Sequence, residues 1–290
     1  MFQHYIITRF NLRRGDWITA KDGKAVLSDL WLEERFELFD NYCFSSVKNQ
    51  TNQNFKWLVF FDTKTPEKYK EIIEQYRLAY SNFHPFFVDG MESFLPAITE
   101  SVSQFDNKEY MISSRLDNDD CIHKDYVKTV QSYFNKQAYL AIDLIDGYRM
   151  ETGRRVRLGK MKNLFNPYIS LIENGDGAKT VWHKGHTYWK YEKRVLTVKN
   201  SRMWMTIIHE KNKKNTFLGY GRVRSDVIDD FGIKEPKRLE LKANYYDIRH
   251  WRVRSMKNRI KVMEAYYSKR FKEVSGVYRI KGKIDKDDFA

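Results

Sequence analysis

The chain has 290 residues, of which 42% are hydrophobic and 16% aromatic, and it carries 52 Lys+Arg against 38 Asp+Glu. This length allows one large domain with an extension, while the lack of any run of about 18 apolar residues argues against a membrane span. Cys43 and Cys121 have no paired spacing, which argues against zinc-finger and disulfide-scaffold proteins and predicts a cytoplasmic location.

Predicted strands and helices alternate over residues 1–135, which is typical of an α/β unit with a mostly parallel sheet. The residue patterns predict strands at 4–10, 55–62, 83–89 and 110–114, helices at 27–46, 94–106 and 125–135, and a further helix capped by Thr65. Ligands of such sheets bind at the carboxyl ends of the strands. The polar residues at those ends are therefore candidate ligand contacts: Thr8, Arg9, Asp62, Asp89 and Asp117.

Shorter elements are predicted after residue 135. From Lys234 to the last residue there are 17 Lys+Arg and 8 Asp+Glu, so much of the net charge of +14 lies in this segment. We therefore expect two domains, a ligand-binding domain at 1–234 and a basic, mostly helical extension at 235–290. The elements predicted are strands at 139–144, 148–151, 154–158, 168–172, 180–182, 187–188 and 203–210, a short helix at 225–231 and a helical segment at 237–271.

The stretch SSRLDNDD, at 113–120, places three aspartates directly after a predicted strand. Carboxylates two residues apart can both reach one divalent cation if the chain turns, and Mg²⁺ or Mn²⁺ prefers such oxygen ligands. Asp117 and Asp119 have this spacing, Asp120 extends the cluster, and Arg115 precedes it. The alternative is that these acids cap the following helix and interact with its dipole.

Three histidines are further candidates. His209 ends the apolar run at 203–210, from which a returning strand could bring it to the acidic cluster as a metal ligand. The alternative is a hydrogen-bonded core histidine. His183 and His186 flank Gly185 in WHKGHTYW, in a segment predicted to be extended, and they fit contacts to an acceptor or a turn better than metal binding.

Six segments, in a fixed order between residues 2 and 217, carry a family resemblance. They are HYIITRFNL, FKWLVFFD, SSRLDNDD, NPYISLIE, HKGHTYW and MWMTIIHEKN. With them the chain resembles the rhamnosyltransferase family, a group similar to GT-A glycosyltransferases. The resemblance implies a GT-A-like, Rossmann-type nucleotide-sugar-binding fold with a mixed central sheet over residues 1–234, and it does not cover the basic extension.

The same resemblance implies roles for individual residues. Asp117 and Asp119 match the two acids of the DxD motif, which hold Mn²⁺ or Mg²⁺ on the donor diphosphate, and His209 matches a late histidine that completes the metal site. Residues matching nucleotide-sugar contacts are Thr8, Arg9 and Asp62, with Asp89 and Arg115 added by their positions.

An acceptor-side base is also implied by the resemblance. Inverting members of this fold carry a carboxylate there, which would take a proton from the acceptor hydroxyl. Glu173 in SLIENGD is the predicted base, and Asp176 is the reserve candidate. The expected reaction is transfer of a sugar, rhamnose by resemblance, from a nucleotide-sugar to a glycan or a lipid-linked acceptor.

The basic extension leaves several interpretations open. Its apolar positions, flanked by Arg and Lys, can pack on the catalytic domain, pair in a homo-oligomer, or lie on an anionic membrane at the inner face. The composition also permits a nucleic-acid-binding protein or a non-catalytic basic protein. Because the basic residues concentrate in the extension rather than around the acids, and no nucleic-acid-binding motif is found, we expect no nucleic acid partner.

Overall fold

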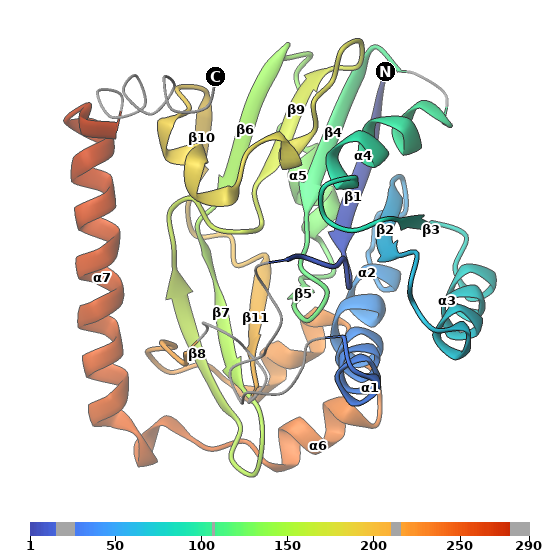
Figure 1. Ribbon diagram of the computed structural model, residues 1–290. Coiled ribbons are helices and arrows are strands. Elements are labelled where there is room, and N and C mark those ends of the chain that lie inside the picture. Colours follow the sequence, from blue (N-terminus) through green and yellow to red (C-terminus); the bar gives the residue numbers. More distant parts are fainter. Residues whose placement is uncertain (16–26, 106–107, 210–215, 279–290) are drawn as a thin grey trace.

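The structure is a computed structural model, and it describes residues 1–15, 27–105, 108–209 and 216–278. Its central feature is a seven-stranded sheet with the order β10-β6-β9-β4-β1-β2-β3 (Figure 1). The strands are β1 (Phe2–Arg9), β2 (Lys56–Asp62), β3 (Phe83–Val88), β4 (Tyr110–Arg115), β6 (Tyr139–Leu144), β9 (Ser170–Asn174) and β10 (Val195–Val198).

The four strands that come first in the chain, β1 to β4, run parallel to one another, as the sequence predicts. Alternate side chains of β2 enter two different cores: Trp57 packs on one face of the sheet, and Leu58 and Phe60 pack on the other. Helices connect these strands and lie against the sheet (Figure 1). They are α1 (Asp29–Leu38), the π-helical turn η1 (Phe39–Phe44), α2 (Ser45–Lys48), α3 (Glu67–Ala79), α4 (Phe94–Ser103) and α5 (Tyr126–Gln131).

Strand β9 makes the sheet mixed, because it runs antiparallel to both β4 and β6. A second, four-stranded sheet with the order β5-β11-β7-β8 lies below it in Figure 1. Together these elements confirm the predicted α/β fold with a mixed central sheet. The second sheet consists of β5 (Cys121–Ile122), β7 (Asp146–Glu151), β8 (Arg157–Lys162) and β11 (Trp204–Ile208).

Several local predictions differ from the structure. The strands predicted at 180–182 and 187–188 are 3-10 turns, η2 (Val181–His183) and η3 (His186–Tyr191), because Thr180 takes a positive φ and its hydroxyl accepts from the Trp182 amide. Strand β8 begins three residues later than predicted. Thr65 does not cap α3, because its hydroxyl donates to the Asp62 carbonyl and accepts from Asn11.

The basic C-terminal segment is helical, as predicted. It contains the 3-10 turn η5 (Ile248–His250) and the helices α6 (Lys237–Ala243) and α7 (Arg252–Val274), and it follows the 3-10 turn η4 (Ser225–Phe231). Helix α7 packs against β8, burying Ser255, Asn258, Val262 and Tyr266. Among the helices in the described part of the chain, none combines the length and apolarity needed to cross a bilayer. The domain boundary after residue 234 stays a prediction.

A buried histidine predicts how stability depends on pH. His4 on β1 lies between Ser114, 2.8 Å from its Nε2, and Gln131, and burial lowers its pKa to about 3. The unfolded chain binds a proton at this residue below its ordinary pKa of about 6.5, whereas the folded chain does not. The contribution of neutral His4 is therefore complete above about pH 6.5 and is lost as the pH falls toward about 3.

We expect urea unfolding to show a smaller free energy of unfolding at about pH 5 than at about pH 7, and His4→Gln to reduce that difference. Glutamine does not titrate, so it serves as the comparison at the same site. An identical pH dependence in the parent and the variant would contradict this assignment.

Candidate active site

The acidic stretch forms a loop at the carboxyl end of β4, beside the end of β1. The Arg115 amide donates to the Ile169 carbonyl at 3.2 Å, and the Leu116 amide donates to the Ile7 carbonyl at 3.3 Å. The loop then turns, with the Asp120 amide 3.4 Å from the Asp117 carbonyl. These backbone contacts place the aspartates at the sheet edge where ligands of parallel α/β sheets bind.

Asp120 joins the two sheets rather than facing a ligand. Its carboxylate accepts from the Tyr168 hydroxyl at 2.5 Å and from the Ile207 amide of β11 at 2.9 Å. Tyr168 in turn contacts the Thr206 hydroxyl at 2.8 Å and stacks on Trp204. Burial, followed by the charges of Asp119 and Asp117, raises the pKa of Asp120 well above its usual range.

Asp119 has two basic neighbours. The Arg35 Nη1 of α1 lies 2.7 Å from Asp119 Oδ2, and the Nε2 of His209 lies 3.3 Å from the same oxygen. Burial opposes ionisation of Asp119, but the charges and hydrogen bonds of Arg35 and His209 outweigh it and lower the pKa below its ordinary value. The carboxylate is therefore ionised at neutral pH.

Asn118 fixes the position of Arg35. Its amide group donates to the Phe10 carbonyl at 2.6 Å, and its Oδ1 accepts from Arg35 Nη1 at 3.0 Å. The Trp31 ring lies 4.9 Å from the Arg35 guanidinium carbon on the same helix. Because Arg35 is held from three sides, its contact with Asp119 is part of a fixed network and not a surface ion pair.

A cationic surface borders the acids on the other side. The guanidinium carbon of Arg115 lies 3.8 Å from the centre of the Trp182 ring, and that of Arg9 lies 5.7 Å from it. Arg115 Nη2 is 3.8 Å from Asp117, the most exposed acid of the loop. The buried Nε of Arg115 has no hydrogen-bond partner in the described chain, which leaves a donor suited to an anionic oxygen.

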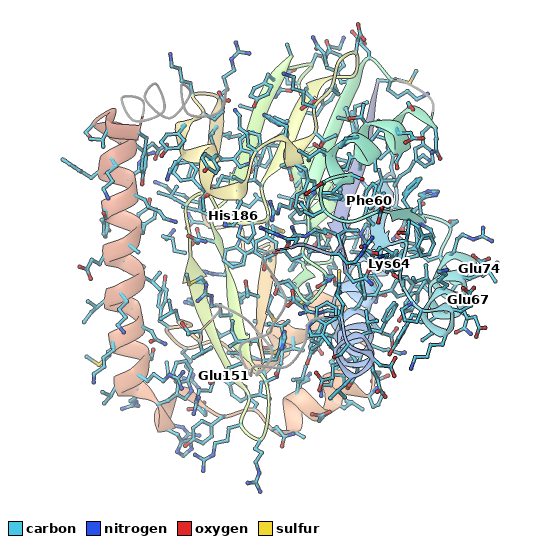
Figure 2. All side chains as sticks on the ribbon, in the orientation of Figure 1. Phe60, Lys64, Glu67, Glu74, Glu151 and His186 are labelled. Carbon is cyan, nitrogen blue, oxygen red and sulfur yellow. The ribbon has the colours of Figure 1, made fainter. Side chains whose placement is uncertain are left out.

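His186 lies near these groups. In Figure 2 it lies between α7 and the central strands. Burial, followed by the positive charge of Arg115, lowers its pKa, and Asp117 acts in the opposite direction. Its imidazole is therefore neutral at neutral pH and can accept a proton. His183 is used differently, since its Nδ1 lies 2.6 Å from the Thr180 carbonyl and its ring packs against Trp189.

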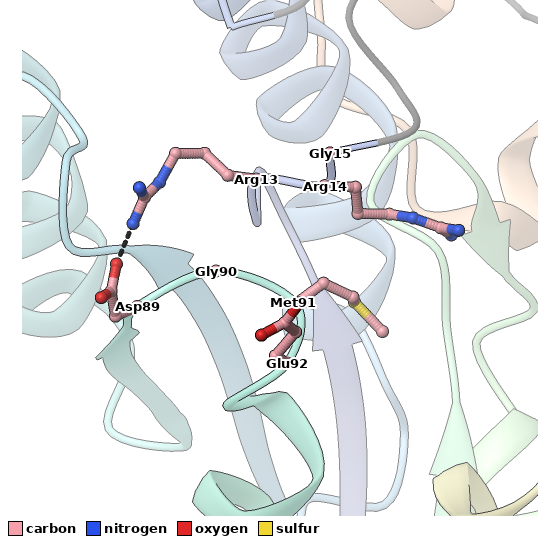
Figure 3. Close-up of a pocket in the computed structure, with 7 residues that line it drawn as sticks. All are labelled: Arg13, Arg14, Gly15, Asp89, Gly90, Met91 and Glu92. Atoms are coloured by element: carbon pink, nitrogen blue, oxygen red, sulfur yellow. Dashed lines mark hydrogen bonds and ion pairs between the residues drawn. The ribbon is translucent and has the colours of Figure 1, made fainter.

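A second polar group surrounds Arg13, after β1. Asp62, at the end of β2, accepts from the Arg13 amide at 3.0 Å and from its Nε at 2.7 Å, while the Arg13 Nη2 pairs with Asp89 after β3. An open pocket of about 550 Å³ lies here, lined by Arg13, Arg14, Gly15 and residues 89–92 (Figure 3). Asp62 and Asp89 thus lie on one edge of the sheet, joined by an arginine that the sequence analysis did not select.

Two predicted catalytic residues lie elsewhere. Glu173 pairs with Met111 near the start of β4, because β9 runs antiparallel to β4, and Asp176 follows it beyond that end of the sheet. The rise over the six residue steps from Met111 to Asp117 puts Glu173 roughly 20 Å from the acidic loop. The Glu173 carboxylate accepts from the amides of Lys179 and Thr180, so the structure gives it a local structural contact.

Among the predicted nucleotide contacts, Thr8 is enclosed in the core. Its side chain is fully buried, and its hydroxyl accepts from the Trp57 indole at 2.9 Å. The structure does bring together Asp117, Asp119, His209 and Arg115, and it places Arg9 against the same tryptophan as Arg115. Residues that the sequence analysis missed are Arg35, Asn118, Tyr168 and Trp182.

The acidic loop has a donor set that suits a hard cation in part. Asp119 and His209 lie close enough to be neighbouring ligands of one ion, and Asp117 is two residues away. Within the described ranges, no three or more His, Cys, Asp and Glu side chains are grouped to hold a metal. Mg²⁺ in proteins commonly binds one or two carboxylates and completes its shell with water and substrate phosphates. The residues fit such an ion when a diphosphate is also bound.

Several solved structures resemble the chain at low similarity. Residues 1–349 of TarS from S. aureus in complex with UDP are 11% identical, with a TM-score of 0.41, and the match covers 83% of this chain and 70% of that chain. The complex of the same protein with UDP-GlcNAc is 13% identical, with the same TM-score and coverage. HddC from Yersinia pseudotuberculosis is 11% identical, with a TM-score of 0.32 and coverage of 72% and 90%.

No curated protein sequence matches the chain. The family described as "Putative rhamnosyl transferase", in contrast, matches residues 3–219. This match spans the central sheet, the acidic loop and β11, and it ends before α6 and α7. The chain therefore belongs to this rhamnosyl transferase family and is a glycosyltransferase.

Proposed function

We propose that the protein transfers rhamnose from a nucleoside diphosphate donor to a glycan or a lipid-linked acceptor, with Mn²⁺ or Mg²⁺ as cofactor. The observation that carries this proposal is the pairing of acids and cations at the carboxyl end of β4. The Asp119 cluster with Arg35 and His209 lies on one side of the loop, and Arg115 with Trp182 lies on the other.

In this proposal Asp117, Asp119 and His209 hold the cation. When bound, it supplies positive charge to the leaving diphosphate. Arg35 keeps the Asp119 carboxylate ionised and oriented, since it contacts Oδ2 at 2.7 Å. Arg115 and Arg9 bind diphosphate oxygens, for which a planar guanidinium with free donors is suited. Trp182 holds Arg115 in place through its ring face.

On the acceptor side, we assign His186 the contact with the reacting hydroxyl. Glu173 is too far from the loop for this role, whereas His186 lies within electrostatic range of both Arg115 and Asp117. Its lowered pKa leaves it neutral at neutral pH, so it can accept the hydroxyl proton during attack on the sugar. The pocket at Arg13 and Asp89 lies at the neighbouring strand ends and provides room for the nucleoside part of the donor.

The test is a donor screen that measures nucleoside diphosphate release. Nucleoside diphosphate donors of rhamnose, glucose and N-acetylglucosamine are compared, each with Mn²⁺, with Mg²⁺ and with a chelator. We expect release with the rhamnose donor that depends on the cation, and His186→Gln to reduce the rate by about 10²-fold or more, which is the usual contribution of a positioned base.

Each part of the proposal has its own contradicting outcome. Equal rates with and without the chelator would contradict the need for a cation. A faster rate with the glucose or N-acetylglucosamine donor would contradict rhamnose as the donor sugar. An unchanged rate in His186→Gln would contradict the assignment of His186 as the base. His183→Gln is the matched control, because His183 binds the Thr180 carbonyl instead of facing Arg115.

A further inference from the structure

Helix α7 has two opposite faces. One is buried on the protein: Asn258 donates to the Phe217 and Gly219 carbonyls, and Val262 is 2% exposed. The other face carries a stripe of large apolar side chains that are each 65% to 72% exposed. Their spacing of three, four or seven residues keeps them on one side of the helix. The stripe consists of Val253, Met256, Ile260, Tyr267, Phe271 and Val274.

Basic side chains border this stripe on both sides. At 100° per residue, Lys257 and Lys261 fall on one border, and Arg252 and Arg259 fall on the other. The acidic residues of α7 are Glu264, which is exposed and by the same rule falls between the stripe and the border formed by Lys257 and Lys261, and Glu273, which is paired with Arg270 at 2.7 Å. The exposed face is therefore apolar along its centre, and its edges carry a net positive charge, because four basic residues outnumber the one acid. The basic residues exposed on the helix are Arg252, Arg254, Lys257, Arg259, Lys261 and Lys272.

This pattern of charge distinguishes among the surfaces that could cover the stripe. A second copy of α7 packed on the stripe would bring basic borders against basic borders, which repel. A nucleic acid would satisfy the lysines and arginines but would leave six apolar side chains against phosphates or water. An anionic lipid surface meets both requirements, because the stripe enters the boundary between headgroups and acyl chains while the borders contact the headgroups.

We propose that α7 is a membrane-docking helix that lies flat on an anionic lipid surface through the Val253–Val274 stripe. The helix has 23 residues and so extends roughly 35 Å along that surface. Figure 1 shows α7 at one side of the molecule, with the sheets on its inner side only. Docking through the outer face therefore leaves the contacts of the buried face intact.

The buried face also fixes how the active site would lie relative to the lipid. Lys269 donates to Asn163 Oδ1 at 2.9 Å and to the Leu164 carbonyl at 2.8 Å, and its charge contributes to the lowered pKa of His186. The C-terminal half of α7 thus lies on the acceptor side of the site. Docking would hold that side near the membrane surface, where a lipid-linked acceptor is found. The link to the acceptor rests on the proposed function, whereas the docking of α7 on the membrane does not.

The experiment is sedimentation of the full chain with vesicles of phosphatidylcholine alone or of phosphatidylcholine mixed with phosphatidylglycerol. The variants are Ile260→Asp/Phe271→Asp, which places charge in the stripe, and Lys257→Gln/Lys261→Gln, which removes charge from one border. Leu78→Asp is the matched control, since Leu78 on α3 is 72% exposed and lies outside α7. Nucleoside diphosphate binding in solution is measured on every variant.

We expect the parent and Leu78→Asp to bind the anionic vesicles and not the neutral ones, and added salt to weaken this binding. Ile260→Asp/Phe271→Asp should bind at least tenfold more weakly, Lys257→Gln/Lys261→Gln several-fold more weakly, and both should retain nucleotide binding. Equal vesicle binding by the parent and Ile260→Asp/Phe271→Asp overturns the proposal, and so does equal binding to neutral and anionic vesicles. A parent dimer that Ile260→Asp/Phe271→Asp dissociates, with no vesicle binding, assigns the stripe to a second copy instead.

Discussion

Replacing Asp119 with Asn should reduce sugar transfer by about a hundredfold or more, a loss typical of removing one charge-stabilising group from an active site. The ionised Asp119 carboxylate contacts both Arg35 and His209, and in our proposal it also binds the cation on the donor. An amide offers Arg35 a neutral acceptor and the cation a weaker ligand. Initial rates at saturating donor and calorimetric nucleoside diphosphate binding, each with and without Mn²⁺, check this prediction.

Folding must be separated from chemistry in that variant. Arg35 is 8% exposed, and a buried cation without its counter-charge costs about 3–5 kcal/mol of unfolding free energy. Asp120→Asn is the control, because Asp120 contacts Tyr168 and Ile207 and its raised pKa already favours the neutral form. We expect Asp120→Asn to transfer sugar within about tenfold of the parent rate. Comparable losses of rate in the two variants would contradict a specific role for Asp119.

Gly147→Ala is expected to lower the stability of the protein clearly. Gly147 lies on β7 beside Trp204 of β11, and a methyl group at this position would overlap the indole ring far inside van der Waals contact. The ring cannot move freely, because its Nε1 donates to the Leu144 carbonyl at 2.6 Å and its face stacks on Tyr168. Overpacking of this kind costs about 1–3 kcal/mol or more, so Tm should fall by several degrees.

The same variant should also disturb the active site, since Tyr168 holds Asp120 in the acidic loop. Gly15→Ala is the control: a methyl group there meets no atom within 4 Å. Thermal unfolding of both variants and nucleotide binding of Gly147→Ala are the measurements, since Gly15 lines the proposed nucleoside pocket and is a control for stability alone. If Gly147→Ala unfolds at the same temperature as the parent, the Trp204–Tyr168 stack does not fix the packing between the sheets.

The sequence predicts the first part of the fold well, because local patterns determine it. The buried run of β2 and its terminal Asp62 identify a parallel strand and its ligand-binding end without tertiary information. The segment at 180–191 is different. Its β-branched and aromatic residues favour a strand, but the positive φ of Thr180 and its hydroxyl contact to the Trp182 amide produce 3-10 turns. Such backbone exceptions leave no periodic signal in the sequence.

The site is predicted where it lies within one segment and missed where distant segments meet. Asp117 and Asp119 were found from their spacing after a strand. Arg35 lies 84 residues earlier on α1, and an arginine on a helix surface has no feature that indicates a carboxylate partner. Glu173 lies away from the acidic loop for a topological reason: a strand direction cannot be read from composition, and the antiparallel β9 carries its final acid to the far edge of the sheet.

The contact between α7 and β8 affects how the chain folds during its synthesis. Strand β8 ends at Lys162, whereas Tyr266, on the helix that covers it, is made about 100 residues later. At about 5–20 residues per second, the ribosome takes roughly 5–20 s to make that stretch. For this time the nascent second sheet lacks the helix that covers β8. The apolar side chains of β8 are then available to chaperones, and α7 is the last large element of the described chain to pack.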